Sequence, residues 1–471
     1  MLTYSFVDLG SDSLYEHLYK CIKNDIMSGN LKAGDRLPSK RTFAKNLDIS
    51  TITVENAYAQ LMAEGYIFSV PKKGYFVSRV KTLAEKKTKD KKKPELSVKE
   101  AECFADFVSN QTKSMNFPFS IWAKLTREVL SGESETLLLP PPSGGIMELR
   151  KAIADHLYQF RGMDVSPDQI IIGAGTEYLY GLLIQLFGTK VSYAVEDPGY
   201  KKIGQIYESH GVKVCHIPMD ASGVLPDVLE ESKADILHLS PSHHYPTGIV
   251  TPISRRYELL GWASKSEGRY IIEDDYDSEF RLLGRPIPAL QSIDVMDKVI
   301  YMNTFSKSLS STIRISYMIL PVKLLKKFYE RLGFYSCTVS NFEQYTLARF
   351  ISEGYFEKHI NRMRNYYRNQ RDRLLECVKK SSLAPHIHIK EENSGLHFLM
   401  EIDTYLTDEE LERKAWAQGV KISCLSRYYQ NPEQAVKHAV VLNYSGIDVD
   451  KMQQAMEVLG QCVDSKDKQE N

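Results

Sequence analysis

Lys307 stands in a segment, Thr304 to Ser308, whose side chains could hold a phosphate group beside a reactive amine. Thr304 and Ser306 supply hydroxyl groups, and Arg314 follows the lysine with a guanidinium group whose fork of N–H donors suits phosphate. A lysine attacks an aldehyde only after it loses its proton, and neighbouring positive charge favours that loss. The segment therefore predicts a lysine that forms a Schiff base with a phosphorylated aldehyde.

Asp274 and Tyr276 follow a strand-like run at residues 269–273 and could complete such a site. An acidic side chain at the end of a buried strand is costly unless it has a partner, and a cationic ring nitrogen would suit Asp274. Tyr276 offers a phenol. A Schiff-base lysine, an aspartate for a pyridinium nitrogen and a phosphate site are what pyridoxal 5'-phosphate requires, so the residues predict this cofactor.

Three further segments follow strand-like runs. Gly175 and Thr176 open a helical pattern, and the N–H groups at a helix start can bind phosphate, although a structural turn would have the same residues. Tyr200 could stack on a flat ring, or could serve only in packing beside Pro-Gly. His243 and His244 are adjacent, and adjacent side chains of an extended chain point apart, so a metal site is not expected.

The residues from 111 to 471 alternate apolar, strand-like runs with helical patterns, which is typical of an α/β domain with a mainly parallel sheet. In such sheets functional groups gather at the carboxyl ends of the strands, which is where the candidate residues lie. The clearest strands are predicted at residues 169–173, 191–195, 212–217, 236–240, 269–273 and 298–303.

The first 80 residues predict three helices and a hairpin, the pattern of a winged helix-turn-helix. Gly29 can end the first helix, while Ser39 and Ser50 can cap the second and third. In this fold the third helix enters the DNA major groove and the hairpin wing touches the backbone. A winged helix that binds protein is the alternative. The candidate DNA contacts are Ser39, Lys40, Arg41, Ser50, Thr51, Thr53, Asn56, Lys72 and Lys73.

Residues 81–95 contain seven lysines and almost no apolar side chains, so they predict a linker that cannot bury enough surface to fold. This charge run is either solvated surface or a basic strap that contacts nucleic-acid phosphate. We therefore expect a DNA-binding domain at 1–80, a Lys-rich linker at 81–110 and an α/β domain at 111–471.

The composition is that of a globular protein from a reducing compartment. The chain has 471 residues, 43% of them hydrophobic, and 60 basic residues balance 60 acidic ones. No apolar run is long enough for a transmembrane helix, and no secretory signal is visible. The seven cysteines contain no C-x-x-C pair, so disulfides and zinc are not expected. We predict a cytoplasmic protein that does not bind membranes.

Both halves of the sequence resemble known families. The run LPSKRTFAKNLDIS and the helix and hairpin after it resemble the GntR family of bacterial transcription regulators. Residues from about 115 to 460 resemble fold-type I, class I aminotransferases, through a P-T-G loop and a T-x-S-K motif followed by Arg. Together the halves resemble the MocR/GabR family of pyridoxal-phosphate-dependent regulators, whose loop variants are similar to SHHYPTG and EDDYDSEF.

The resemblance implies a role for each candidate residue of the cofactor site. Lys307 would form the internal aldimine, Asp274 would pair with the ring nitrogen and Tyr276 with the ring hydroxyl, while Tyr200 would lie against the ring. The phosphate would be held by Gly175, Thr176, Thr304, Ser306 and Arg314.

Other positions bear on the effector and on turnover. Aminotransferases usually have Asn before Pro-Thr-Gly, and Tyr245 stands there in this chain, which argues against full transaminase turnover. Arg427 is the candidate contact for an effector carboxylate, with a surface salt bridge as its alternative role. Lys202 could add a second anion contact.

The resemblance further implies a head-to-tail homodimer that binds a double-stranded DNA operator and a small-molecule effector. In the predicted mechanism an amine or amino acid displaces Lys307, forms an external aldimine and so changes which conformation is favoured. Two alternatives are a regulator that senses pyridoxal phosphate itself and a working aminotransferase with an accessory DNA-binding domain. The sequence does not predict the effector, the operator or the sign of regulation.

Overall fold

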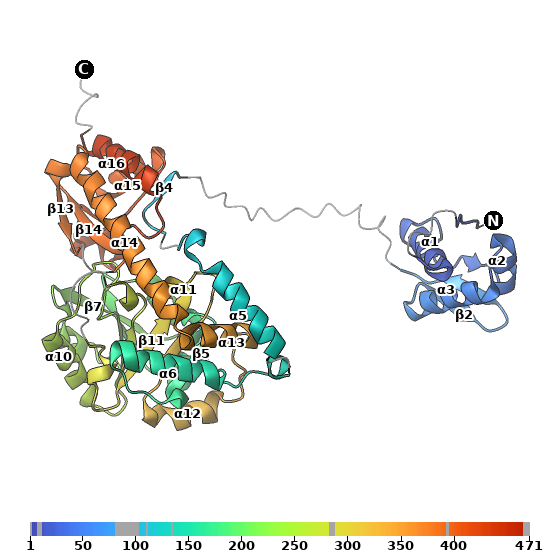
Figure 1. The fold of residues 1–471 in the computed structure, drawn as a ribbon, viewed down its shortest axis with the longest axis horizontal. Coiled ribbons are helices and arrows are strands. Elements are labelled where there is room, and N and C mark those ends of the chain that lie inside the picture. The colour runs from blue at the N-terminus through green and yellow to red at the C-terminus, as the bar shows by residue number, and fades with distance from the viewer. Residues whose placement is uncertain are drawn as a thin grey trace, which may run out of the picture. The chain divides into compact units, whose positions relative to one another are not determined.

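The computed structural model describes residues 2–6, 12–80, 103–109, 112–132, 135–281, 288–391 and 395–464. The chain forms two compact units, which divide between Glu100 and Ala101 (Figure 1). Within the described residues, no helix is both long and apolar enough to cross a membrane.

The first unit is a winged helix-turn-helix, as predicted. Its elements are α1 (Leu14–Ser28), β1 (Arg36–Leu37), α2 (Lys40–Leu47), α3 (Thr51–Ala63), β2 (Ile67–Val70) and β3 (Gly74–Val77). The strands form a sheet in the order β1-β3-β2. The predicted pattern of three helices and a hairpin did not include β1, because this strand has two residues and exists through its pairing with β3, Arg36 opposite Phe76.

The three helices enclose one apolar core, to which α1 contributes Leu18 and Ile22 and α3 contributes Val54 and Tyr58. These residues recur at helical spacing, which is why one face of each helix is buried. Ser39 and Ser50 cap α2 and α3 as predicted, each accepting a hydrogen bond from a backbone N–H three residues later.

The second unit is built on an eight-stranded sheet in the order β5-β12-β11-β10-β9-β6-β7-β8. Only β12 and β8 run antiparallel to their neighbours among these strands, so the sheet is mainly parallel. The strands are β5 (Ile170–Gly173), β6 (Tyr193–Asp197), β7 (Val214–Asp220), β8 (Gly223–Val224), β9 (Ile236–Leu239), β10 (Tyr270–Asp274), β11 (Val299–Thr304) and β12 (Ser316–Ile319).

Helices cover both faces of this sheet, since successive side chains of a strand point to opposite faces (Figure 1). One face packs against α7 (Thr176–Phe187), α8 (Lys201–Ser209) and α12 (Val322–Leu332). The other face packs against α6 (Met147–Arg161), α9 (Pro226–Glu231), α10 (Ile253–Ser264) and α13 (Asn341–Ser352). Two further helices of this unit are α5 (Phe119–Gly132) and the short α11 (Phe305–Ser308).

A smaller sheet, in the order β13-β14-β17-β16, lies toward the C-terminus. Its strands are β13 (Ile387–Lys390), β14 (His397–Ile402), β16 (Ser423–Cys424) and β17 (Ala439–Asn443), and the long helix α14 (Tyr355–Lys380) precedes it. Helices α15 (Asp408–Ala417) and α16 (Val449–Asp464) contribute side chains to the same core as this sheet and α14.

The second unit begins earlier than the predicted boundary at residue 111. Strand β4 (Ala105–Asp106) pairs in parallel with β15 (Val420–Lys421), and Phe107 is fully buried in the core. Residues 103–109 therefore belong to this unit, although they were predicted as linker. The remainder of the predicted linker, residues 81–102 and 110, lies outside the described residues.

Candidate functional site

A cavity of about 370 Å³ opens at the carboxyl ends of the parallel strands in the second unit. The elements that line it include the starts of α7 and α11 and the residues that follow β6, β9 and β10. Nine of the predicted site residues line it, namely Thr176, Tyr200, Lys202, Asp274, Tyr276, Thr304, Ser306, Lys307 and Arg314.

Lys307 lies in the single turn of α11, directly after β11. The turn is held by Thr304, whose Oγ1 accepts hydrogen bonds from the Ser306 N–H at 3.1 Å and from the Ser316 hydroxyl at 2.8 Å. Burial lowers the pKa of Lys307 to about 8, and the negative charge of Asp277 partly opposes that shift. The lysine is therefore more readily deprotonated near neutral pH than a lysine in water.

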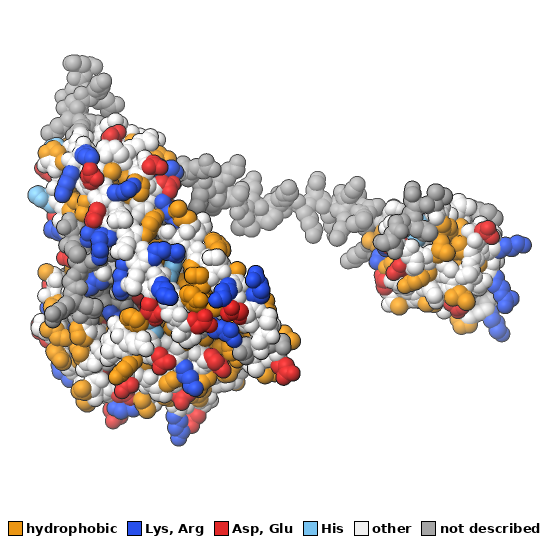
Figure 2. Space-filling model, in the orientation of Figure 1, with side chains coloured by type: hydrophobic (Ala, Val, Ile, Leu, Met, Phe, Trp, Pro, Cys, Tyr) orange, Lys and Arg blue, Asp and Glu red, His pale blue; other side chains and the backbone are white. Residues whose placement is uncertain are grey.

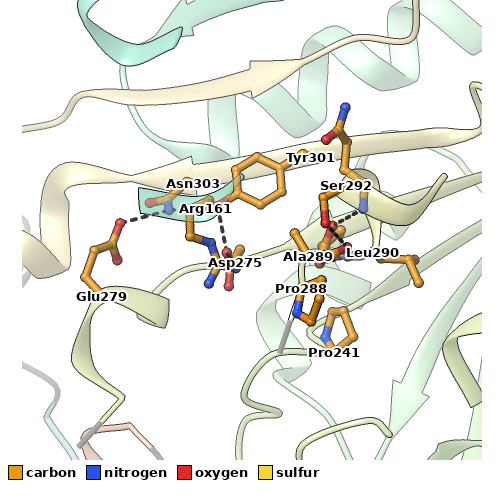
Figure 3. A network of polar contacts seen from close by, with 12 residues as sticks. Arg161, Pro241, Asp275, Glu279, Pro288, Ala289, Leu290, Ser292, Tyr301 and Asn303 are labelled. Atoms are coloured by element: carbon orange, nitrogen blue, oxygen red, sulfur yellow. Dashed lines mark hydrogen bonds and ion pairs between the residues drawn. The ribbon is translucent and has the colours of Figure 1, made fainter. Parts of the chain in front are cut away.

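Asp274 and Asp275, which are neighbours at the end of β10, have separate partners. Oδ2 of Asp274 accepts a hydrogen bond from Tyr180 at 2.7 Å, while its buried Oδ1 has no partner among the described residues. Oδ2 of Asp275 accepts hydrogen bonds from Tyr301 and Arg161, both at 2.6 Å (Figure 3). Asp274 is thus the member of the pair that faces the cavity, and Asp275 belongs to a structural network.

Three further aromatic side chains, Tyr200, Tyr245 and Tyr276, line the cavity. Tyr200 is half-exposed and its ring meets that of Tyr245 edge-on, with 5.8 Å between ring centroids. The Tyr245 hydroxyl is hydrogen-bonded to that of Tyr428 at 2.8 Å. Tyr276 lines the cavity, and burial raises its pKa well above the ordinary value, so its hydroxyl keeps its proton at neutral pH.

The backbone before α7 forms a cradle for the Arg314 side chain. Gly175 has a φ of 97°, which disfavours any residue with a side chain, and a Cβ there would lie 2.3 Å from Nη2 of Arg314, so a larger residue would displace the guanidinium. The carboxylate of Glu177 lies between two cations, since it is hydrogen-bonded to Lys202 and is 3.5 Å from Arg314. Arg314, the predicted phosphate contact, and Lys202, the predicted effector contact, therefore share Glu177 as a carboxylate partner.

Two of the predicted cofactor and effector residues do not line this cavity: Gly175, which adjoins Arg314, and Arg427. Nε of Arg427 is hydrogen-bonded to Glu412 of α15, and its side chain is 60% exposed. The contact is the salt bridge named above as the alternative role. His243 and His244 point to different partners, Asp277 and Thr247, and the described residues include no cluster of three or more His, Cys, Asp or Glu side chains that could hold a metal.

The cavity also includes residues that the sequence did not indicate. Tyr180 stands one helical turn after Thr176, so its position on the same face of α7 was a usable signal. Glu196 lines the cavity with a side chain that is 8% exposed, and desolvation raises its pKa to about 8. No sequence pattern marked Glu196, because its environment is created by segments distant in the chain.

In the first unit, the predicted DNA contacts lie on α2, on α3 and in the turn between β2 and β3. Arg41, Thr51, Asn56, Lys72 and Lys73 are exposed. Lys40 forms an ion pair with Glu55 of α3 at 2.5 Å, so its ammonium would exchange this partner for phosphate on contact with DNA. Figure 2 shows basic side chains gathered at one edge of this unit.

Comparison with known proteins covers both units. Residues 14–77 match the gntR family of bacterial regulatory proteins, and residues 105–459 match aminotransferase class I and II. The chain is 31% identical to the probable rhizopine catabolism regulatory protein MocR of Rhizobium meliloti, over 95% of this chain and 93% of that protein.

The chain belongs to the MocR/GabR family. It is also 40% identical to the uncharacterised HTH-type transcriptional regulator YdeL of Bacillus subtilis, over 95% of this chain and 96% of that protein. Among solved structures, an archaeal alanine:glyoxylate aminotransferase matches with a TM-score of 0.69 and 24% identity, over 78% of this chain and 92% of that one. Like other members of this family, the protein is a transcription regulator with a fold-type I domain, and fold-type I homologues depend on pyridoxal phosphate.

Two observations test whether the cavity residues fit that cofactor. The unpartnered Oδ1 of Asp274 is an acceptor that a ring N–H would satisfy. The cradle at Gly175 places the start of a helix and the Arg314 guanidinium side by side, which is a setting for a phosphate. Both observations agree with the charge and shape of pyridoxal phosphate.

Proposed function

We propose that this protein holds pyridoxal phosphate on Lys307 and that an amine or amino acid, by exchanging with Lys307, changes how tightly the protein binds its operator. The observation that carries the proposal is the convergence of Lys307, Asp274, Tyr276 and Arg314 on one cavity. These residues come from separate segments of the second unit, and a core without a ligand does not need them together.

Each side chain would have a distinct task. Pyridoxal phosphate supplies an aldehyde that condenses reversibly with primary amines. Lys307, with its lowered pKa of about 8, provides a neutral amine in useful amount at physiological pH. Asp274 would accept the ring N–H on Oδ1, Tyr276 would donate to the ring oxygen, and Arg314 would balance the phosphate charge.

The remaining predicted residues would hold parts of the ligands. Tyr200 would cover one face of the ring, and the hydroxyls of Thr176 and Ser306 would help to hold the phosphate. Lys202 would contact an anionic group of the effector once its hydrogen bond with Glu177 had opened. Arg427 would take part only if its contact with Glu412 opened.

On the DNA side, we propose that α3 reads the major groove and that the wing contacts the backbone. Asn56 and Thr51 are exposed on α3, and an asparagine side chain suits the edge of adenine. Lys72 and Lys73 at the wing would neutralise phosphates. A homodimer would present two such modules to the two halves of an operator.

A second candidate is a regulator that senses pyridoxal phosphate alone. Lys202 and Arg427 are each bonded to an internal carboxylate, Glu177 and Glu412, which leaves less free positive charge for an effector anion. The chain is also 28% identical, over 96% of its length, to a relative from Corynebacterium glutamicum named as the pyridoxine biosynthesis transcriptional regulator PdxR.

Absorbance spectra test the cofactor site. Protein loaded with pyridoxal phosphate should show a band at about 420 nm, which the variant Lys307→Ala lacks. Lys326→Ala, a substitution of an exposed lysine on α12, is the matched control and should keep the band. Titration with amines should shift the band if an amine is the effector, and should leave it unchanged if the protein senses the cofactor alone. Absence of the band from the wild-type protein would contradict the proposal.

A further inference from the structure

A buried polar group that the proposed function does not use lies directly behind Tyr276. Nδ1 of His243 is 2.8 Å from Oδ2 of Asp277 and 3.2 Å from the Tyr276 hydroxyl. The side chains of His243 and Asp277 are 4% and 2% exposed. Burial of an imidazole and a carboxylate is costly, so their position beside a cavity-lining phenol needs an explanation.

The hydrogen on Nδ1 of His243 fixes the direction of the hydrogen bonds among the three side chains. An imidazole nitrogen carries at most one hydrogen, and a carboxylate only accepts. At 2.8 Å from Asp277, Nδ1 of His243 must therefore be the N–H donor, because two facing lone pairs would repel. The same N–H faces the Tyr276 oxygen, so Tyr276 cannot donate its own hydrogen to Nδ1.

The hydroxyl hydrogen of Tyr276 is consequently left for another acceptor. No other hydrogen bond of Tyr276 is present within the described part of the chain, and Tyr276 lines the cavity. The His243–Asp277 pair thus makes the phenol a donor toward the cavity. A phenol without this neighbour could rotate its hydrogen toward either side.

The backbone of another segment is shaped to accept this pair. Gly395, just before β14, has a φ of 63°, and a Cβ there would lie 1.9 Å from Cε1 of His243 and 2.7 Å from Oδ2 of Asp277. His397 of β14 packs on His243, with 4.5 Å between ring centroids. Segments after β9, after β10 and before β14 therefore meet at the pair, and packing locks its geometry.

We propose that His243 and Asp277 are positioning residues that fix the Tyr276 hydroxyl as a hydrogen-bond donor to the ring oxygen of the cofactor. The inference rests on the proposed function, since the ring oxygen belongs to pyridoxal phosphate. Tyr245 occupies the usual place of Asn before Pro-Thr-Gly, but its hydroxyl is hydrogen-bonded to Tyr428. The pair would orient the remaining donor, Tyr276.

The pH dependence of the cofactor band reports on this hydrogen bond. A donor to the ring oxygen withdraws negative charge from it, so the nearby nitrogen of Lys307 holds its proton less tightly. Loss of the donor should raise the midpoint of the band's pH titration. The titratable side chains that face Tyr276 and His243 are Asp274, Asp277, Glu196, Tyr245, His244, His397 and Lys307.

The experiment is a pH titration of the band at about 420 nm in the full-length, cofactor-loaded protein. His243→Leu should raise the midpoint by about one pH unit, the size expected for loss of one hydrogen bond. His243→Asn should stay near the wild-type value, since its amide N–H can take the place of Nδ1–H. Tyr276→Phe should raise the midpoint as well, and adding His243→Leu to it should cause no further shift.

An unchanged midpoint in His243→Leu, or the same shift in the Tyr276→Phe background, would overturn the inference. If His243→Leu does not fold, Asp277→Asn serves instead, because its amide donates to Nδ1 and reverses the imidazole tautomer. The shift in titration midpoint that Asp277→Asn causes must then differ between the wild-type and Tyr276→Phe backgrounds. Absence of the band from the wild-type protein would overturn the proposed function itself, so the two failures are distinguishable.

Discussion

Tyr180 donates a hydrogen bond to Oδ2 of Asp274 over 2.7 Å and leaves Oδ1 of the same carboxylate without a partner among the described residues. One oxygen is thereby anchored by α7, and the other remains for a ring N–H. We expect Tyr180→Phe to weaken the binding of pyridoxal phosphate about fivefold, since a net hydrogen bond contributes about 1 kcal/mol. An absorbance titration measures the dissociation constant. Tyr178→Phe, on the same helix outside the cavity lining, should bind as the wild type does; equal losses in both variants would contradict the assignment.

Under the proposed function, Glu177 should compete with the cofactor phosphate for Arg314. Its carboxylate lies between Lys202 and Arg314, and all three side chains are about half exposed, so solvent and salt screen the interaction. Glu177→Gln should therefore tighten binding of pyridoxal phosphate by a modest factor, about threefold at low salt, with a smaller gain at high salt. Glu208→Gln, an exposed change on α8, is the control. Weaker binding in Glu177→Gln would show instead that Glu177 orients Arg314.

The lowered pKa of Lys307 sets a pH window for cofactor uptake. With a pKa of about 8, the neutral fraction of the amine rises about fivefold between pH 7 and pH 8. The rate at which the cofactor-free protein takes up pyridoxal phosphate should rise in parallel, as followed by the growth of the band in stopped flow. A rate that does not change over this window would contradict the assignment of Lys307 as the reacting amine.

The same pKa affects stability without cofactor. The unfolded lysine keeps its proton up to a pH of about 10.4, but the folded one loses it near pH 8, so the unfolded state binds more protons between these values. This group's contribution to stability is therefore unfavourable below pH 8 and improves as pH rises toward 10. We expect cofactor-free Lys307→Met to melt at a higher temperature than wild type at pH 7, with a smaller difference at pH 9.5. Calorimetry of both proteins would check this, and a lower melting temperature at pH 7 would contradict it.

The wing lysines should contribute nonspecific affinity for DNA. Changing Lys72 and Lys73 together to Ala should weaken binding to all duplexes and reduce the slope of log affinity against log salt by about two. Lys23→Ala is a suitable control, because its ammonium is already paired with Glu64. Fluorescence anisotropy at several salt concentrations gives the slopes, and an unchanged slope in the wing variant would remove these residues from the interface.

Much of the site could be predicted because its residues follow strands of a parallel sheet. Asp274 is the last residue of β10, and Lys307 lies in the turn that follows β11. The apolar runs at 269–273 and 298–303 had marked these two strands. The carboxyl ends of parallel strands meet at one edge of the sheet, so the positions of these residues at strand ends were enough to predict that their side chains lie close together. The caps at Ser39 and Ser50 were equally visible, because capping is local.

The features that the sequence did not reveal depend on distant segments. The pairing of β4 with β15 joins residues far apart in the chain, and so places residues 103–109 in the second unit rather than in the linker. The contact of Arg427 with Glu412 likewise depends on how α15 packs. The sequence did not indicate a positioning role for His243 or Asp277, because the two side chains come together only where Gly395 leaves room for them. Tyr180 alone offered a local signal, its spacing from Thr176.

The central claim is that chemistry at Lys307 controls DNA binding, and operator affinity tests it most directly. A duplex selected from a random pool by the wild-type protein would serve as the operator. Its dissociation constant would be measured for cofactor-loaded wild type and for Lys307→Ala, each with and without an amine that shifts the cofactor band. The account predicts that the amine changes the wild-type constant at least about fivefold, the lower end of usual coupling between sites, and leaves Lys307→Ala unaffected. The same constant with and without amine in the wild type, or an equal change in Lys307→Ala, would contradict it.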